Sequence, residues 1–200
     1  MVDVQLRARG IRSERVLQVM RTVPRHEFVS ESYRARAYED SPLPIGSGQT
    51  ISQPYVVALM TELVDAGPEH RVLEVGTGSG YQAAVLSQLV RAVYTIEIVP
   101  ELARAATERL ARLGYHNVYV REGDGYRGWP EHAPFDGIVV TAGATEIPKP
   151  LLEQLKPGGR LVIPVGSGPA HQTLQVVVKN PDGTINIRHV APVRFVPLRR

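Results

Sequence analysis

Three glycines at alternate positions, Gly76, Gly78 and Gly80, follow a short apolar run that ends at Val75. Glycine adopts backbone angles that other residues avoid, and without a Cβ it lets a ligand press against the backbone. The helix predicted after this loop begins with free N–H groups that can donate hydrogen bonds. A strand, a glycine loop and a helix in this order predict a site for a nucleotide-like ligand. A glycine turn that merely joins a strand to a helix is the alternative.

An acidic residue, Glu97, ends the next predicted strand, 21 residues after Gly76. In nucleotide-binding α/β units, an acid at this place accepts hydrogen bonds from ribose hydroxyls. A carboxylate suits this role because it only accepts and can take both hydrogens of the diol. It would repel a 2′-phosphate, so NADP is disfavoured. The alternative is a charge that serves the start of the next helix, near Glu101.

A second acid, Asp124, stands between Gly123 and Gly125 after a short predicted strand. Its carboxylate could accept a hydrogen bond from an exocyclic amine, while Gly125 would permit close approach. Together with the first two motifs, this stretch indicates contact with an adenine ring. A plain Asp-Gly turn is the alternative.

Residues 38–54 show no clear periodicity and are rich in proline, glycine and small polar side chains. Long loops without secondary structure are uncommon in compact domains and are often functional. Pro54 opens a predicted helix, with Ser52 or Gln53 near its N-cap. The segment is therefore a second candidate for function, and helix capping by Thr50 and Ser52 is the alternative.

The elements that must position these residues alternate along the middle of the chain. Apolar runs predict strands near residues 71–75, 92–98, 118–120, 135–143 and 161–165, with helical spacing between them. This alternation predicts an α/β fold, a doubly wound, Rossmann-like and mostly parallel sheet. The fourth run is nearly all apolar, so we expect that strand to be buried on both faces.

The two ends of the chain show different patterns. Residues 1–65 are expected to be mainly helical and to pack around the ligand edge of the sheet, with Ser13 as the N-cap of a helix. Residues 174–178 and 185–187 flank an Asn-Pro-Asp-Gly turn, which predicts a C-terminal antiparallel strand pair. A last strand is expected near residues 191–196, and the order of the final strands stays open.

The 200 residues suit a single domain. We expect it to span residues 1–200, with an N-terminal helical and substrate-loop segment at 1–65 and an α/β core at 66–200.

Composition narrows the classes of partner. Twenty Arg stand against three Lys in a chain of net charge +3, and no dense basic run precedes the final Arg199-Arg200, so no nucleic-acid partner is expected. No apolar run approaches the roughly 18 residues of a membrane span. Without cysteine the chain forms no disulfide or thiolate metal site, and no metal is expected. The charged N-terminus lacks the apolar core of a signal peptide, so we predict a cytoplasmic protein and a monomer.

The compact Gly-x-Gly-x-Gly spacing is similar to motif I of S-adenosylmethionine-dependent methyltransferases. Five separated stretches share a further similarity: residues 43–54, which include Thr50-Ile51-Ser52-Gln53-Pro54, residues 74–81, 123–125 and 134–138, and the ending Val193-Arg194-Phe195-Val196-Pro197-Leu198. With these stretches in this order, the chain resembles the protein-L-isoaspartate O-methyltransferase family of the bacterial and archaeal type over nearly its whole length.

This resemblance implies methyl transfer from S-adenosyl-L-methionine to the free α-carboxylate of L-isoaspartyl residues in damaged proteins and peptides, with S-adenosyl-L-homocysteine as the product. It implies these roles by position: Ser52 as the active-site serine, Thr50 and Ile51 in the same cofactor-binding loop as Ser52, Glu74, Gly76 and Gly78 at the methionine end of the cofactor, Glu97 at the ribose, and Asp124 and Gly125 at the adenine. Val57 stands where some relatives carry a polar cofactor contact, which leaves that contact in doubt.

A carboxylate acceptor is already ionised at neutral pH, so the reaction requires no general base. We expect Ser52 to orient the carboxylate by a hydrogen bond rather than to remove a proton. Two alternatives stay open: a methyltransferase acting on a small molecule or RNA, and a binding module without catalysis. The second would not need the loop around Ser52.

Overall fold

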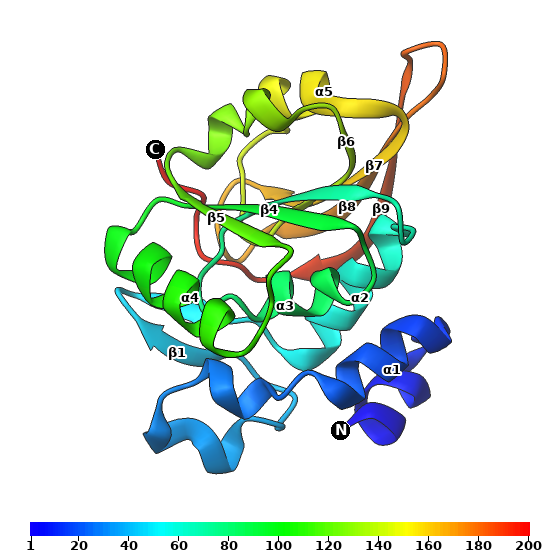
Figure 1. The fold of residues 1–200 in the computed structure, drawn as a ribbon. Helices are drawn as coiled ribbons and strands as arrows, with labels where there is room; N and C mark the ends of the chain where they lie inside the picture. Colours follow the sequence, from blue (N-terminus) through cyan, green and yellow to red (C-terminus); the bar gives the residue numbers. More distant parts are fainter.

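A seven-stranded sheet forms the centre of the computed structural model, which describes residues 1–200 (Figure 1). Its strands are β3 (Arg71–Val75), β4 (Ala92–Glu97), β5 (Val118–Glu122), β6 (Phe135–Val140), β7 (Leu155–Gly166), β8 (Gln172–Lys179) and β9 (Ile185–Val193). They lie in the order β5-β4-β3-β6-β7-β8-β9; the pairs from β5 to β7 are parallel and the last two pairs are antiparallel. The predicted Rossmann-like fold with an antiparallel C-terminal strand pair is confirmed.

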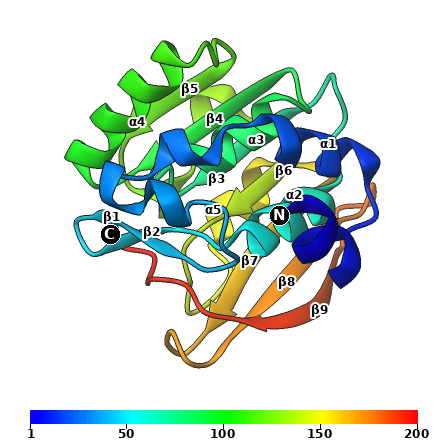
Figure 2. The same ribbon diagram turned by 90° about the horizontal axis from the view of Figure 1, so that it is seen from below.

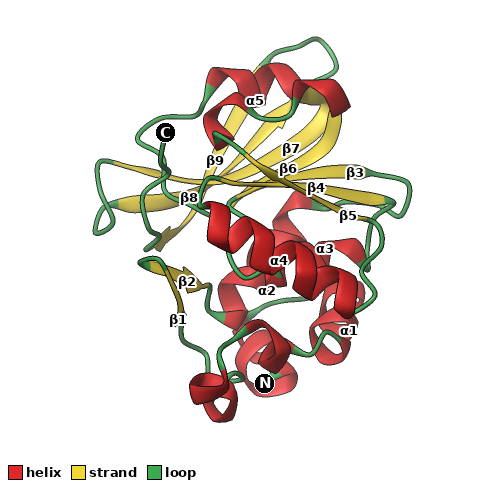
Figure 3. Ribbon diagram, turned by 60° about the vertical axis from the view of Figure 1, so that its left-hand side comes forward, coloured by secondary structure: helices red, strands yellow, loops and turns green.

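Helices cover both faces of the sheet (Figure 3). They are α1 (Glu14–Thr22), α2 (Pro54–Val64), α3 (Tyr81–Ser87), α4 (Pro100–Arg112) and α5 (Lys149–Gln154). Short helical turns are η1 (Val2–Leu6), η2 (Arg7–Arg9), η3 (Arg25–Phe28), η4 (Glu31–Arg36), η5 (Gly125–Arg127) and η6 (Pro130–His132). In Figure 3, α5 lies on one face while α2, α3 and α4 lie on the other. None of these helices has the length and apolar character that crossing a membrane requires.

Alternate residues of the central strands enter two separate hydrophobic cores. Val72 and Val139 belong to a cluster of 32 buried residues that includes side chains of α1, α2 and α3. Leu73 and Ile138 belong to a cluster of 12 buried residues that includes Leu151 of α5. Since successive side chains of a strand point to opposite faces, the sheet is buried on both sides, as the apolar run at β6 predicts.

The direction in which strands are added reverses beside β3. The chain proceeds from β3 to β4 and β5 on one side, and then returns to place β6 and β7 on the other. Val75 and Val140 are register partners at the ends of β3 and β6. The residues that follow them therefore lie side by side at the carboxyl edge of the sheet. In doubly wound sheets this reversal opens a crevice in which ligands bind.

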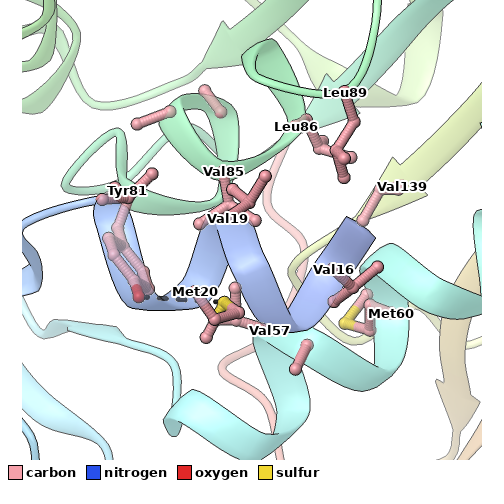
Figure 4. Close-up of a cluster of buried hydrophobic side chains, with 14 of the residues drawn as sticks. Val16, Val19, Met20, Val57, Met60, Tyr81, Val85, Leu86, Leu89 and Val139 are labelled. Atoms are coloured by element: carbon pink, nitrogen blue, oxygen red, sulfur yellow. Dashed lines mark hydrogen bonds between the residues drawn. The ribbon is translucent and has the colours of Figure 1, made fainter. Parts of the chain in front are cut away.

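The N-terminal segment packs on the helices that flank the sheet (Figure 4). Helix α1 begins where predicted, with the Ser13 hydroxyl accepting a hydrogen bond from the Val16 amide. Figure 4 shows α1 presenting Val16, Val19 and Met20 to side chains that include Met60, Tyr81, Val85 and Leu86. The Tyr81 hydroxyl contacts the Met20 sulfur at 3.9 Å. Residues 1–65 thus support α3, the helix that follows the glycine loop.

The predicted irregular loop at residues 38–54 contains a small hairpin, β1 (Leu43–Gly46) and β2 (Gln49–Ile51). Each strand is too short to produce an alternating pattern, so the sequence analysis missed both. Leu43 and Ile51 are register partners and are buried. In Figure 2 the two strands of this hairpin lie side by side. A Cβ at Gly48 would lie 4.0 Å from the Arg199 guanidinium, so this side chain reaches the hairpin turn.

Helix α2 is capped from a distance rather than by its neighbours. Gln53 occupies the predicted N-cap position, but its side chain accepts no capping hydrogen bond. Asp40 accepts instead from the Tyr55 amide at 3.0 Å and from the Gln53 side chain at 2.7 Å. Neither the Thr50 nor the Ser52 hydroxyl therefore caps α2, and the capping alternative is wrong.

The C-terminal strand pair forms as predicted, with β8 and β9 joined by a turn in which the Asn180 amide donates to the Thr184 carbonyl. The expectation of a separate last strand near residues 191–196 is wrong. Strand β9 continues to Val193, and the chain then leaves the sheet. Residues 194–200, called the C-terminal segment below, make one isolated bridge, between Pro197 and Gly143.

Candidate active site

The glycine loop leaves β3 at the carboxyl edge and turns sharply towards α3. Gly76 has φ +101°, and a Cβ there would lie 2.4 Å from the hydroxyl oxygen of Thr141, the residue after β6. A Cβ at Gly80 would press on Leu110 of α4 at 3.3 Å. Close internal packing therefore favours glycine at both positions, which adds to the reason given by the sequence alone.

Glu97 holds the middle of this loop. Its Oε2 accepts from the Gly78 amide at 2.7 Å, and its Oε1 accepts from the Val99 amide at 3.0 Å. The side chain is 6% exposed. A carboxylate has about four acceptor positions, so each oxygen keeps a free position for a diol. The carboxylate lies at the end of β4, next to the loop, as predicted.

Glu74 lies beneath the glycine loop and is fully buried. Its Oε2 accepts from the Thr95 hydroxyl at 2.5 Å, and that hydroxyl contacts the Thr77 hydroxyl at 2.6 Å. Its Oε1 has no hydrogen-bond partner. Burial raises the pKa of Glu74 to about 8; the bond from Thr95 lowers the pKa, while the negative charge of Glu97 adds to the increase.

The two residues of the loop after β5 that were predicted to contact adenine, Asp124 and Gly125, have different surroundings. Asp124 caps the turn η5, because its Oδ1 accepts from the Tyr126 amide at 2.9 Å. Gly125 lines the cavity described next, whereas Asp124 does not. A Cβ at Gly125 would lie 2.3 Å from the Val75 side chain. The turn alternative thus accounts for one oxygen of Asp124, and the adenine contact stays a prediction.

A cavity of about 760 Å³ opens at the carboxyl edge and is called the inner cavity. The predicted site residues in its wall are Thr50, Ile51, Ser52, Glu74, Gly76, Gly78, Glu97 and Gly125. Eight of the nine predicted residues, drawn from four separate stretches, are brought together. Val57, which stands where some relatives carry a polar cofactor contact, lines the same cavity and is buried.

A second depression of about 1290 Å³, the outer groove, runs between α2 and the end of β9. Tyr55, Val56 and Leu59 form one side, and Val193 and Phe195 belong to the other. The two spaces share four wall residues: Thr50, Ser52, Thr141 and Val196. Ser52 therefore stands where the inner cavity meets the outer groove.

The C-terminal segment supplies wall residues that were not among the predicted site residues. Val196, Pro197, Leu198 and Arg199 all line the inner cavity. The resemblance marked this ending as characteristic but carried no contact to Arg199. The end of the chain is expected to fold back over the glycine loop, but its distance along the chain from the other motifs left no spacing signal for the individual contacts.

Sheet order, glycine loop and acidic strand end together define a Rossmann-like α/β protein with a site for a nucleotide-like ligand. The family model described as protein-L-isoaspartate(D-aspartate) O-methyltransferase matches residues 1–200. The chain belongs to this family.

Curated relatives and solved structures agree. A relative from Gloeobacter violaceus, named protein-L-isoaspartate O-methyltransferase, is 56% identical over 200 residues, which is 100% of this chain and 97% of the relative. One from Syntrophobacter fumaroxidans, named protein-L-isoaspartate O-methyltransferase 2, is 64% identical over 92% of this chain and 74% of its own length.

A solved structure described as protein-L-isoaspartate O-methyltransferase aligns with TM-score 0.88 and 33% identity; it covers 98% of this chain, which spans 65% of that longer one. A Plasmodium falciparum structure described as the same kind of enzyme, in complex with S-adenosyl-L-homocysteine, aligns with TM-score 0.84 and 27% identity over 99% of this chain and 96% of that one.

Proposed function

We propose that this protein transfers a methyl group from S-adenosyl-L-methionine to the free α-carboxylate of L-isoaspartyl residues in damaged proteins and peptides. The observation that carries the proposal is the meeting of two spaces at Ser52. The inner cavity suits a nucleoside-bearing cofactor, and the outer groove is open to a peptide. Membership of the family supplies the reaction, and the geometry supplies a place for each reactant.

The residues of the inner cavity fit S-adenosylmethionine. Glu74 has a buried oxygen without a partner, which suits a cationic group such as the methionine ammonium. Glu97 offers free acceptor positions to a ribose diol, and Gly76 and Gly78 bring the backbone close to the ligand. When bound, this cofactor supplies an electrophilic methyl group on a sulfonium. A 2′-phosphate would meet the Glu97 carboxylate, so NADP remains disfavoured.

The chain's own part in the reaction is positioning. The acceptor carboxylate is ionised at neutral pH, so no residue has to remove a proton. Ser52 makes no hydrogen bond within the protein that would hold its hydroxyl away from the junction, and we assign it to donate to the substrate carboxylate. Fixing the attacking oxygen in line with the methyl group is the main requirement of such a transfer. Residues of α2 and of the C-terminal segment flank the junction.

We also propose the roles of the remaining site residues and of the partners. Thr50 and Ile51 belong to the same cofactor-binding loop as Ser52, and Asp124 with Gly125 meets the adenine. Isoaspartyl peptides are the partner class, and no nucleic-acid partner is proposed because the chain carries no dense basic run.

A monomer in the cytoplasm is the proposed state. The exposed large hydrophobic side chains are scattered over separate elements: Val4, Tyr38, Tyr119 and Ile187. Scattered apolar residues differ from the contiguous patch of an obligate interface. The cysteine-free composition suits a reducing compartment.

Incubation with methyl-labelled cofactor and a peptide pair tests the proposed function. One peptide carries L-isoaspartate and the other normal aspartate at the same position. Base-labile label on the isoaspartyl peptide alone is the expected result. Label on neither peptide, from a protein that binds S-adenosylhomocysteine, would leave a binding module. Label on RNA or a small molecule instead would favour a different methyltransferase.

A further inference from the structure

Gln172, the first residue of β8, lies outside both the inner cavity and the outer groove and is 4% exposed. Its side-chain amide makes two hydrogen bonds to one residue of the C-terminal segment. The Phe195 amide donates to Oε1 at 2.7 Å, and Nε2 donates to the Phe195 carbonyl at 3.1 Å. Both groups are buried, so neither bond is exchanged readily for water.

The geometry of these bonds extends the sheet beyond its last backbone pair. Gln172 and Val193 are the final register partners of β8 and β9. In an antiparallel ladder, a hydrogen-bonded pair exchanges two N–H···O bonds. The carboxamide of Gln172 reproduces that exchange with Phe195, two residues beyond the end of β9. It therefore fixes the direction in which the chain leaves the sheet.

The same side chain packs against Gly143, just beyond β6. A Cβ at Gly143 would be 2.1 Å from Nε2 of Gln172, so only glycine leaves room for the amide. The Gly143 amide donates to the Val196 carbonyl at 2.8 Å, and the Leu198 amide donates to the Gly143 carbonyl at 2.8 Å. The C-terminal segment is thus held at Phe195 by Gln172 and at the next residues by Gly143.

These contacts end at the junction of the two spaces. Val196 directly follows the clamped residue and lines both the inner cavity and the outer groove. Pro197 and Leu198 continue along the inner cavity. We propose that Gln172 is a positioning residue for methyl transfer, because its paired hydrogen bonds set the wall against which cofactor and peptide are aligned. This inference rests on the proposed function.

Gln172→Leu tests the inference, since leucine keeps much of the volume and loses both hydrogen bonds. A displacement of about 1 Å in a positioning wall can cost on the order of 100-fold in rate. We expect kcat/KM for the isoaspartyl peptide to fall at least about tenfold, and amide hydrogen exchange in residues 194–200 to accelerate. The exchange measurement needs no activity, so it remains informative if the proposed reaction fails.

Asn117→Leu is the matched control. Asn117 also holds another stretch of chain through its side-chain amide: its Nδ2 donates to the carbonyls of Ser87 at 2.9 Å and Val90 at 3.2 Å. None of these three residues lines either space. The control should lose comparable thermal stability while the kcat/KM for the peptide and the exchange in residues 194–200 stay close to wild type.

Gln172→Glu separates hydrogen bonding from shape. A protonated carboxyl keeps one acceptor and one donor, whereas an ionised carboxylate turns two acceptors towards the Phe195 N–H and carbonyl. Burial favours the neutral form. The charged or titratable neighbours in sequence, His171 and Arg194, are exposed and unchanged in both proteins. Activity relative to wild type should rise as the pH falls from about 8 to about 6.

Three results would overturn the inference: wild-type kcat/KM in Gln172→Leu, an equal loss in Asn117→Leu at matched stability, or a flat activity ratio across pH in Gln172→Glu. Loss of kcat/KM and faster exchange confined to Gln172→Leu, with recovery of Gln172→Glu at low pH, would support it.

Discussion

Ser52 is the residue on which the proposed chemistry depends most directly. Its hydroxyl stands at the junction of the two spaces, and the acceptor needs orientation rather than activation. Ser52→Ala should lower kcat by about 10- to 100-fold, because the transition state loses a positioning hydrogen bond. Affinity for S-adenosylhomocysteine should change little. Steady-state kinetics and calorimetric binding measure the two effects.

Ser47→Ala is the control for Ser52→Ala. Ser47 lies on the exposed turn of the hairpin β1–β2, which directly precedes Ser52. Ser47 lines neither space, so its variant should keep wild-type kinetics. Unchanged turnover in Ser52→Ala would remove this serine from the mechanism.

Glu74 predicts a pH dependence of stability. Its folded pKa is raised to about 8 by burial, well above that of an unfolded carboxyl. Between these two pKa values the folded state therefore holds a proton that the unfolded state has released. The free energy of unfolding consequently falls as the pH rises towards about 8. Each pH unit crossed is worth about 1.4 kcal/mol at most. Glu74→Gln should lack this loss, so its free energy of unfolding should exceed that of wild type increasingly up to about pH 8.

Urea unfolding at several pH values measures the slope for Glu74→Gln. The exposed Glu69→Gln is the control and should keep the wild-type slope. If Glu74→Gln also declined like wild type between about pH 5 and pH 8, another group would be responsible.

Among the elements, the start of helix α2 depends on one distant acid. Asp40 accepts hydrogen bonds from the Tyr55 amide and the Gln53 side chain, and it forms an ion pair with Arg9. These contacts fix the start of α2, which begins two residues after Ser52. Losing a helix N-cap typically costs about 1 kcal/mol, with up to about 2 in proteins.

Asp40→Ala should therefore lower the melting temperature by roughly 2–8 °C and reduce kcat/KM for the isoaspartyl peptide, because Ser52 loses its support. Glu39→Ala is the neighbouring control: it removes an exposed ion pair with Arg36, which is worth at most about 1 kcal/mol. Equal effects of the two substitutions on kcat/KM would argue against a special role of Asp40.

The same elements show what sequence reasoning can reach. The cap at Ser13 and the glycine loop at Gly76 were predicted because their signals lie within a few consecutive residues. Asp40 lies 15 residues before the amide that it caps, and Gln172 lies 23 residues from Phe195. No local propensity specifies such partners, since only the tertiary fold brings them into contact. The hairpin was missed for a related reason. Its strands are too short to show an alternating pattern, and the pairing of Leu43 with Ile51 exists only in the folded chain.

At the scale of the whole molecule, both the site and the larger core are built from residues that lie far apart in the chain. The inner cavity takes walls from the hairpin, the β3 and β4 ends, η5, the residues after β6 and the C-terminal segment. The larger core likewise contains Val2 and Phe195 in a single cluster of 32 buried residues. Segments 1–65 and 66–200 therefore cannot separate without opening both, and we propose that they form one cooperative domain.

Calorimetry tests this proposal through the number of transitions. A single unfolding transition is expected, with equal calorimetric and van't Hoff enthalpies. S-adenosylhomocysteine at about 100 times its Kd should add roughly 2.7 kcal/mol and shift that whole transition upwards by about 5–10 °C. Because the cavity wall draws on both segments, the ligand should not stabilise one part alone. Two transitions, of which the ligand moved one, would show that residues 1–65 unfold independently of the α/β core.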